Sequence, residues 1–165
     1  MVDTGNQFAL GTRDSVVGNA QSGSTFVAYN SGNRLGAALL DFGGNLFLGA
    51  VPDTVGGLAI VIPYPLAAYR EWIGGIVSVD NSHNSRLTNF DGACYYISVV
   101  VLQLIPYSLA GGIGVNLGGA YLRPAPYYVG KKWLCLPKEA ILDVLRIYVI
   151  GVPLFLEASL VEFVT

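Results

Sequence analysis

The chain has 165 residues, of which 53% are hydrophobic and only 12% are charged. A soluble domain has about twice that charged fraction, so these charges are too few to cover a water-exposed surface. The formal net charge is −2, which leaves no long-range field that would attract DNA or acidic lipid. The composition excludes an ordinary soluble enzyme, a nucleic-acid binder and a disordered linker, and it indicates a small, all-α integral membrane protein.

Residues 1–32 form a polar N-terminal segment rich in Gly and Ser. This segment has neither the basic start nor the apolar core of a signal peptide, so we do not expect it to be a targeting signal. We expect residues 33–165 to form the helical membrane domain.

Four apolar blocks follow the polar segment, and a straight membrane span needs about 20 apolar residues. Their ranges are Leu35–Val51, Val55–Val79, Ala93–Leu122 and Ala140–Val164. Only the fourth block is comfortably long enough, and prolines together with the charged pair Arg70-Glu71 interrupt the second. We therefore expect helices that are short, tilted or broken.

The third block has Pro106 near its middle and a cluster of glycines after it. It either crosses the membrane once with a kink or enters and returns as two half-helices. A single crossing divides eight basic residues equally between the two sides, whereas a re-entrant third block places all eight on one side. The positive-inside rule favours the re-entrant topology, although the second block is also a candidate for re-entry. This topology predicts that the loops around Arg86 and Lys131 face the cytoplasm and that Thr165 lies opposite.

The stretch Arg123–Leu136 is basic, aromatic and proline-containing, as is typical of a membrane interface. Aromatic and lysine side chains of this stretch are expected at the depth of the lipid headgroups. These interface anchors are Tyr127, Tyr128, Lys131, Lys132 and Trp133.

Residues suited to metal or catalytic chemistry are sparse. Cys94 and Cys135 are far apart in the sequence and form no CxxC pair. We expect two unpaired thiols, with a disulfide as the alternative. The only histidine, His83, lies in the polar loop Asp80–Asp91, where we expect it to be solvated. The sequence therefore predicts no metal, no cofactor and no enzymatic activity.

Six polar side chains fall within the apolar blocks, where burying a charge in hydrocarbon is costly. They are Asp41, Asn45, Gln103, Asn116, Glu157 and Glu162. One interpretation is a polar track for an ion or solute. In the other, the amides bond between helices, and Asp41 or Glu157 pairs with a cation. Arg34 and Arg146 are the candidate cations, although Arg146 also has Asp143 three residues away on the same helix face.

Glycines in the apolar blocks are expected to bring helices into close contact. The residues expected to do so are Gly43, Gly44, Gly49, Gly111, Gly112, Gly114 and Gly118. Gly114 and Gly118 are four residues apart and therefore lie on one stripe of a helix. A nucleotide-binding loop is excluded, because both the third glycine of a dinucleotide fingerprint and the Gly-Lys-Ser/Thr end of a P-loop are missing.

Four stretches follow one another between residues 33 and 165. They are Asn33-Arg34 with LGAALLDFGGNLFLG, LQLIP with AGGIG and Leu122-Arg123-Pro124, DVLRIYVIGVPLFL, and the ending ASLVEFVT with Glu162. In this order they resemble the stage II sporulation protein M family, polytopic membrane proteins of bacteria and archaea. The family commonly has Pro-His-Gly-x-x-Glu where this chain has Ser98-Val99-Val100 and Gln103. A function that depends on that His–Glu pair is therefore not expected here.

The resemblance implies a scaffold, because the founding member of the family works with cell-wall-remodelling partners during engulfment. We expect a non-catalytic scaffold or accessory subunit that packs against other integral membrane proteins and lipids in a larger complex, with no nucleic-acid partner. The expected location is the prokaryotic inner (cytoplasmic) membrane, with several crossings. A respiratory and a photosynthetic complex are both open alternatives. The alternative function is a small channel or transporter with a polar site between broken half-helices.

Overall fold

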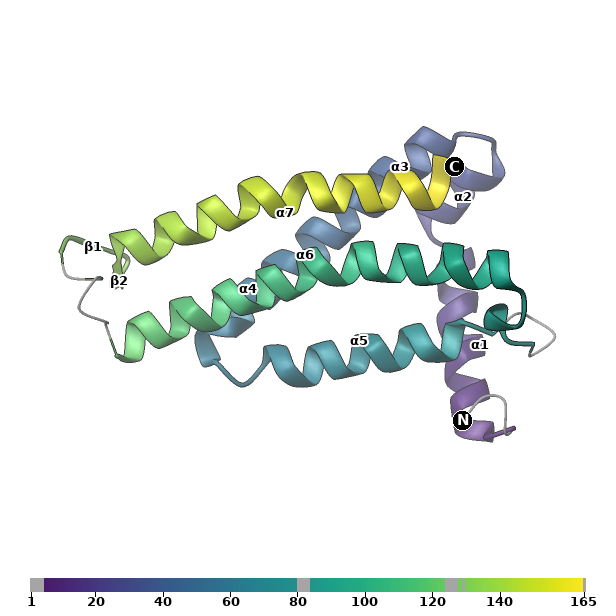
Figure 1. Cartoon of the computed structure of the whole chain (residues 1–165), viewed down its shortest axis with the longest axis horizontal. Helices are drawn as coiled ribbons and strands as arrows, with labels where there is room; N and C mark the ends of the chain where they lie inside the picture. The colour runs from purple at the N-terminus through teal and green to yellow at the C-terminus, as the bar shows by residue number, and fades with distance from the viewer. Residues whose placement is uncertain (1–4, 80–83, 124–127, 129, 165) are drawn as a thin grey trace.

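A computed structural model of the chain describes residues 5–79, 84–123, 128 and 130–164. Four helical segments run side by side along the long axis of the molecule, and each reverses the direction of the one before it (Figure 1). Within the described residues, the fold is all-α apart from a small β-hairpin, as the sequence predicts.

The first long segment runs without interruption from Arg34 to Ala59. It consists of α3 (Arg34–Gly43), the π-helix η1 (Gly44–Ala50), α4 (Val51–Gly56) and the 3₁₀ turn η2 (Gly57–Ala59). The first apolar block, given above as Leu35–Val51, therefore extends into the residues assigned to the second. Pro52 lies inside this continuous segment, directly after the π-helix η1.

The second segment, α5 (Pro63–Val77), returns along the first and is shorter than the others. The short 3₁₀ helix η3 (Arg86–Thr88) then leads into α6 (Phe90–Leu122), a single helix of 33 residues. The prediction of two half-helices in this block is wrong. Pro106 is fully buried inside α6 and lies beside Gly151 and Phe155 of the last helix, so the helix continues through it.

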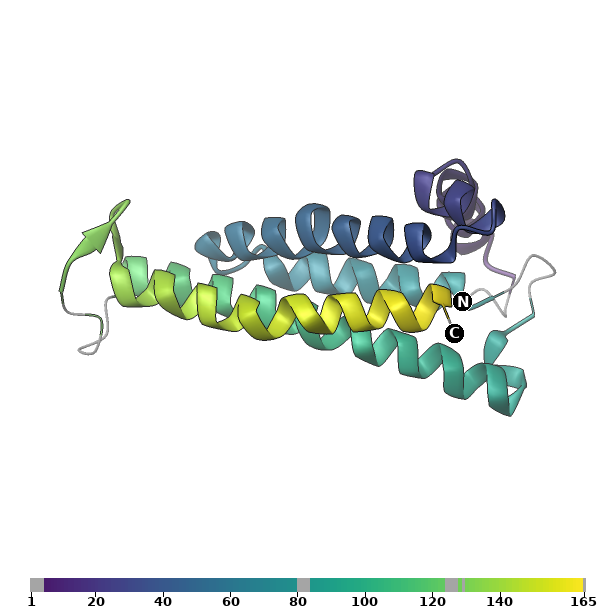
Figure 2. The same cartoon turned by 90° about the horizontal axis from the view of Figure 1, so that it is seen from above.

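After α6, the strands β1 (Lys132–Trp133) and β2 (Leu136–Pro137) pair antiparallel, and α7 (Lys138–Val164) runs back along the bundle. The bundle therefore has two distinct ends (Figures 1 and 2). The end with η3 and Val164 is called the terminal end, and the end with the β1–β2 hairpin is called the hairpin end.

The two ends overturn the predicted topology. The loop segment around Arg86 lies at the terminal end, and Lys131 lies at the hairpin end (Figure 1). Val164 lies at the same end as Arg86, whereas Thr165 itself is outside the described residues. The count of basic residues favoured this topology only if the third apolar block turned back within the membrane. Helix α6 instead runs as one helix from the terminal end to the hairpin end.

Within the described part of the chain, three helical segments are long and apolar enough to cross a membrane: Arg34–Ala59, Phe90–Leu122 and Lys138–Val164. The prediction that only the fourth block has this length is wrong, because the first block continues into the second and the third is unbroken. Many large apolar side chains on these segments are exposed, among them Leu48, Ile97 and Val149.

The core between these helices is built mostly from small residues. Its central cluster contains Leu46, Ala50, Ala110 and Phe155. The rings of Phe155 and Tyr107 pack edge to face, with centroids 4.9 Å apart. Small side chains let the helix backbones approach closely in the middle of the bundle.

The predicted polar N-terminal segment contains two helices, α1 (Gln7–Gln21) and α2 (Ser24–Asn30). Helix α1 lies across the terminal end rather than along the bundle (Figure 1). The buried Arg13 donates hydrogen bonds to the Val79 carbonyl oxygen at 3.1 and 3.3 Å, and Phe8 stacks on Trp72 of α5. These contacts attach α1 to the end of α5.

Candidate functional site

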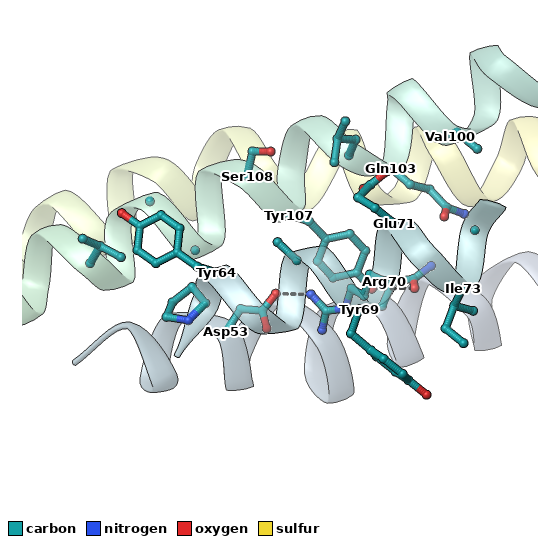
Figure 3. A pocket seen from close by; sticks show the side chains of 18 residues that line it. Asp53, Tyr64, Tyr69, Arg70, Glu71, Ile73, Val100, Gln103, Tyr107 and Ser108 are labelled. Carbon is teal, nitrogen blue, oxygen red and sulfur yellow. Dashed lines mark hydrogen bonds and ion pairs between the residues drawn. The ribbon is translucent and has the colours of Figure 1, made fainter. Parts of the chain in front are cut away.

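A cavity of about 670 Å³ lies between α5 and α6, with η1 and α4 behind it (Figure 3). It follows α5 from Pro63 to Gly74 and α6 from Val100 to Val115. These stretches correspond to about 16 and 22 Å of helix, respectively. We call this cavity the α5–α6 groove.

The two walls touch near both ends of the groove. Toward the terminal end, the Tyr96 hydroxyl donates to the Gly74 carbonyl oxygen at 2.5 Å. Toward the hairpin end, Pro63 lies against Gly111. Between these contacts the groove opens to the molecular surface, since Tyr64 is 66% exposed and Ser108 is also exposed.

Five of the eighteen residues that line the groove are small. They are Ala67, Gly74, Ser108, Gly111 and Gly112. At Gly74 and Gly112, a Cβ atom would meet no atom of another part of the chain within 4 Å. The groove therefore has room for additional side chains.

An ion pair lies at the back of the groove. Arg70 of α5 pairs with Asp53 of α4, which is only 5% exposed (Figure 3). The Arg70 guanidinium also lies over the Tyr107 ring, 4.3 Å from its centroid, in a cation–π contact. The other Asp53 oxygen, Oδ1, is buried and has no hydrogen-bond partner among the described residues. These contacts connect α5 to α4 and α6.

A chain of hydrogen bonds continues from Tyr107 into the bundle. The Tyr107 hydroxyl donates to Asn45 Oδ1 at 2.7 Å, and Asn45 Nδ2 donates to Asp41 Oδ2 at 2.8 Å. The same Asp41 oxygen accepts from Ser159 Oγ at 2.7 Å. Among the described residues, neither Asp41 nor Glu157 forms an ion pair with Arg34 or Arg146, so this predicted pairing is wrong. Arg34 instead lies over the Tyr29 ring.

The remaining predicted polar residues do not join this chain. Gln103 Nε2 donates to Glu162 Oε2 at 2.6 Å, which links α6 to α7. Asn116 Nδ2 donates to the Tyr128 hydroxyl at 2.8 Å. Glu157 is exposed. The six residues thus fall into separate groups instead of one continuous track.

Only some of the glycines that were expected to bring helices together lie in close helix contacts. A Cβ at Gly114 would lie 2.5 Å from the Thr54 carbonyl oxygen, and one at Gly118 would lie 2.6 Å from the Gly57 oxygen. A Cβ at Gly49 would collide with the Tyr107 ring. These three glycines lie in tight contacts, and Gly111 lies against Pro63 at ordinary distance. Three others, Gly43, Gly44 and Gly112, have open space at the Cβ position.

Four of the five predicted interface anchors are among the described residues and lie at the hairpin end. Lys131, Lys132 and Trp133 are exposed, whereas Tyr127 is outside the described residues. The Tyr128 hydroxyl donates to Asp143 Oδ2 at 3.0 Å.

The remaining sequence expectations concern one ion pair, the two cysteines, the histidine and metal binding. Arg146 pairs with Asp143, as their spacing predicts. Cys94 and Cys135 are both free and exposed. His83 lies outside the described residues. Among the described residues, no three His, Cys, Asp or Glu side chains gather as a metal site would require.

Sequence reasoning missed three residues of the groove, Asp53, Arg70 and Tyr107. It also missed Ser159, which lies outside the groove and donates to Asp41. A signal existed for the first two, because opposite charges 17 positions apart flank a proline-containing turn between apolar segments. No comparable signal marks Ser159, whose partner Asp41 is 118 positions away.

Comparisons of the chain with protein-family models, with curated proteins and with solved structures find no match. The α5–α6 groove is therefore the feature from which a function is inferred.

Proposed function

We propose that this chain is a multi-pass membrane protein that acts as a non-catalytic accessory subunit, and that the α5–α6 groove holds a transmembrane helix of a partner protein. The observation that carries the proposal is a laterally open groove between two helices of an apolar bundle, with small residues on both of its walls. The exposed apolar side chains of the three long helices support a location in lipid.

The shape of the groove suits a helix. Transmembrane helices associate mainly through close packing, and small residues such as Gly, Ala and Ser permit that packing. The groove extends along about three to four turns of its two walls, and each wall has small residues among its larger ones. The groove opens on the side of the bundle, and a helix of a neighbouring protein would lie on that side.

Polar groups on the walls supply specificity. Glu71 and Ser108 line the groove and are both exposed (Figure 3). Polar groups within hydrocarbon are stabilised when a neighbouring helix offers a hydrogen-bonding partner. We therefore expect the partner helix to present a donor, such as a hydroxyl, an amide or a basic side chain, opposite Glu71.

The proposed location, a prokaryotic inner membrane, and the scaffold role are carried over from the expected resemblance of residues 33–165 to the stage II sporulation protein M family, although no family model matches the chain. The proposal keeps the scaffold part of this resemblance only. The residues at the family's Pro-His-Gly-x-x-Glu signature are different here, and Gln103 bonds to Glu162.

A channel or transporter is the second candidate function. The Asp53–Arg70 pair and the hydrogen-bond chain from Tyr107 to Ser159 favour it, because polar groups inside a membrane bundle often mark a solute path. The lateral opening of the groove favours docking instead, since a transport path must reach the two ends of the bundle.

Filling the groove tests the proposal. Gly112→Leu adds a side chain where the groove has open space, so we expect normal folding and a loss of partner co-purification after gentle solubilisation. Gly75→Leu is the matched control, because Gly75 is exposed on the same helix pair but does not line the groove. Equal co-purification of both variants would contradict docking. Proton or Na⁺ flux in proteoliposomes that Gly112→Leu abolishes, with assembly intact, would favour the transporter.

A further inference from the structure

Basic residues are concentrated at the hairpin end. Between positions 123 and 146 the chain has five basic and two acidic residues, whereas the remainder has four basic and nine acidic residues. The two acids, Glu139 and Asp143, both lie near Arg146. Arg123, Lys131 and Lys132 are exposed and form no ion pair within the described residues. The net charge of −2 therefore conceals a local basic surface.

The β1–β2 hairpin combines this charge with an apolar tip. Trp133 pairs with Leu136 across the hairpin, and the turn between them consists of Leu134 and Cys135. Both turn residues have left-handed backbone conformations, with φ values of 50° and 66°. Such conformations are unfavourable for residues other than glycine. The turn nevertheless presents Leu134 at 92% exposure, beside Trp133 at 52% exposure.

The hairpin lies beyond the ends of α6 and α7, at one extremity of the bundle (Figures 1 and 2). If these helices cross a bilayer, the hairpin lies at the level of the headgroups. An apolar tip flanked by lysines matches that layer, where acyl chains and phosphates are a few ångströms apart. Lys138 Nζ lies 5.3 Å from the centroid of the Trp133 ring, which orients the ring within the basic surface.

We propose that the β1–β2 hairpin binds anionic phospholipids. Leu134 and Trp133 enter the acyl boundary, and Lys131 and Lys132 contact the lipid phosphates. Each lysine near an anionic membrane surface contributes roughly a fivefold gain in affinity. This site is independent of the α5–α6 groove, so it holds whether or not a partner helix binds there.

The two tryptophans of the chain allow a direct test. Trp72→Phe leaves Trp133 as the only tryptophan, and Trp133→Phe leaves Trp72, which lies on α5 and packs against α1. Each variant is reconstituted in vesicles of equal phosphatidylglycerol and phosphatidylcholine, with brominated acyl chains on only one of the two lipids. Bromine quenches tryptophan fluorescence only at short range, so the quenching ratio reports which lipid surrounds each tryptophan.

We expect brominated phosphatidylglycerol to quench Trp133 at least twofold more than brominated phosphatidylcholine, and to quench Trp72 without preference. Lys131→Gln with Lys132→Gln should remove the preference at Trp133, while Arg34→Gln at the terminal end should not. Equal quenching of Trp133 by the two lipids would overturn the proposal, as would a preference that survives the lysine substitutions. Inorganic phosphate should not abolish the preference. If it did, the site would be one for free phosphate and not for lipid.

Discussion

The ion pair between Asp53 and Arg70 attaches α5 to α4 at the back of the groove. The two residues come from helices on either side of a turn, and Arg70 also contacts Tyr107 of α6. A buried ion pair contributes little net stability relative to apolar residues, but removing one partner is costly because the other charge remains buried. The pair therefore fixes the position of α5 against α4, and it adds little to the net free energy of unfolding.

Arg70→Gln is predicted to lower the free energy of unfolding by about 3–5 kcal/mol, because it leaves Asp53 charged and buried without its cation. Asp53→Asn combined with Arg70→Gln should recover much of that loss, since no uncompensated charge remains. Thermal unfolding in detergent of the two single variants and the double variant measures the coupling. Additive losses would mean that the two residues act independently.

Gln103→Leu is predicted to lower stability by about 1–3 kcal/mol, because it removes the amide that donates to Glu162. Gln103→Glu should lower stability at least as much as Gln103→Leu, since it places a second carboxylate beside Glu162. Position 99 is a valine, so no histidine is available there to pair with the new carboxylate. Ser108→Ala, an exposed change on the same helix, is the stability control. If Gln103→Glu altered proton or Na⁺ flux while assembly stayed normal, the scaffold proposal would be replaced by the transporter.

At the scale of elements, the closest helix contact joins α6 to α4 and η2. Gly114 and Gly118 of α6 face Thr54, Gly57 and the carbonyl of Leu58, with no room for a Cβ atom. Thr54 Oγ1 also lies 3.0 Å from the Ala110 carbonyl oxygen, to which it donates. The backbones of α4 and α6 are therefore in direct contact at Gly114, and the hydrogen bond from Thr54 to Ala110 joins the same two helices.

Gly114→Leu and Gly118→Leu are each predicted to separate these helices, because the new side chain would collide with backbone atoms that cannot move aside. We expect a large loss of folded protein, measured as the monodisperse yield in size-exclusion chromatography. Gly119→Leu is the matched control, since a Cβ there meets no atom of another part of the chain within 4 Å. Normal yield of the Gly114→Leu, Gly118→Leu double variant would count against this contact.

The sequence predicts part of this arrangement. Small residues four positions apart and apolar stretches are local signals, so they indicate the α6 contact stripe and the all-α fold. Pro106 was misleading, because proline breaks a helix unless its tertiary surroundings permit it. The packing of Pro106 against α7 was not visible in the sequence. The groove itself depends on long-range contacts and was therefore not predictable.

At the scale of the whole molecule, the basic residues divide between the two ends. Arg13, Arg34 and the η3 segment with Arg86 lie toward the terminal end, whereas Arg123, Lys131, Lys132 and Lys138 lie at the hairpin end. This is the division that a single crossing of the third block predicts, except that Arg70 is paired inside the bundle. The excess at the hairpin end predicts that this end faces the cytoplasm.

The two native cysteines report this orientation. Cys94 lies near the terminal end of α6, and Cys135 lies in the turn of the hairpin. In intact cells, a membrane-impermeant maleimide should label Cys94 in a Cys135→Ser variant and should spare Cys135 in a Cys94→Ser variant. Inverted vesicles should give the reverse pattern. Labelling of both cysteines from one side would restore the re-entrant topology.

The central claim, that the α5–α6 groove holds a partner helix, is tested most directly by site-specific crosslinking in native membranes. Benzoylphenylalanine replaces Ser108 on the groove, or Val149, which is 74% exposed on α7 and outside the groove, as the control. The proposal predicts a discrete protein adduct from position 108 that disappears when Gly112→Leu is added, while the products from position 149 do not change. A position-108 variant that gives no protein adduct, or an adduct that persists with Gly112→Leu, would contradict it.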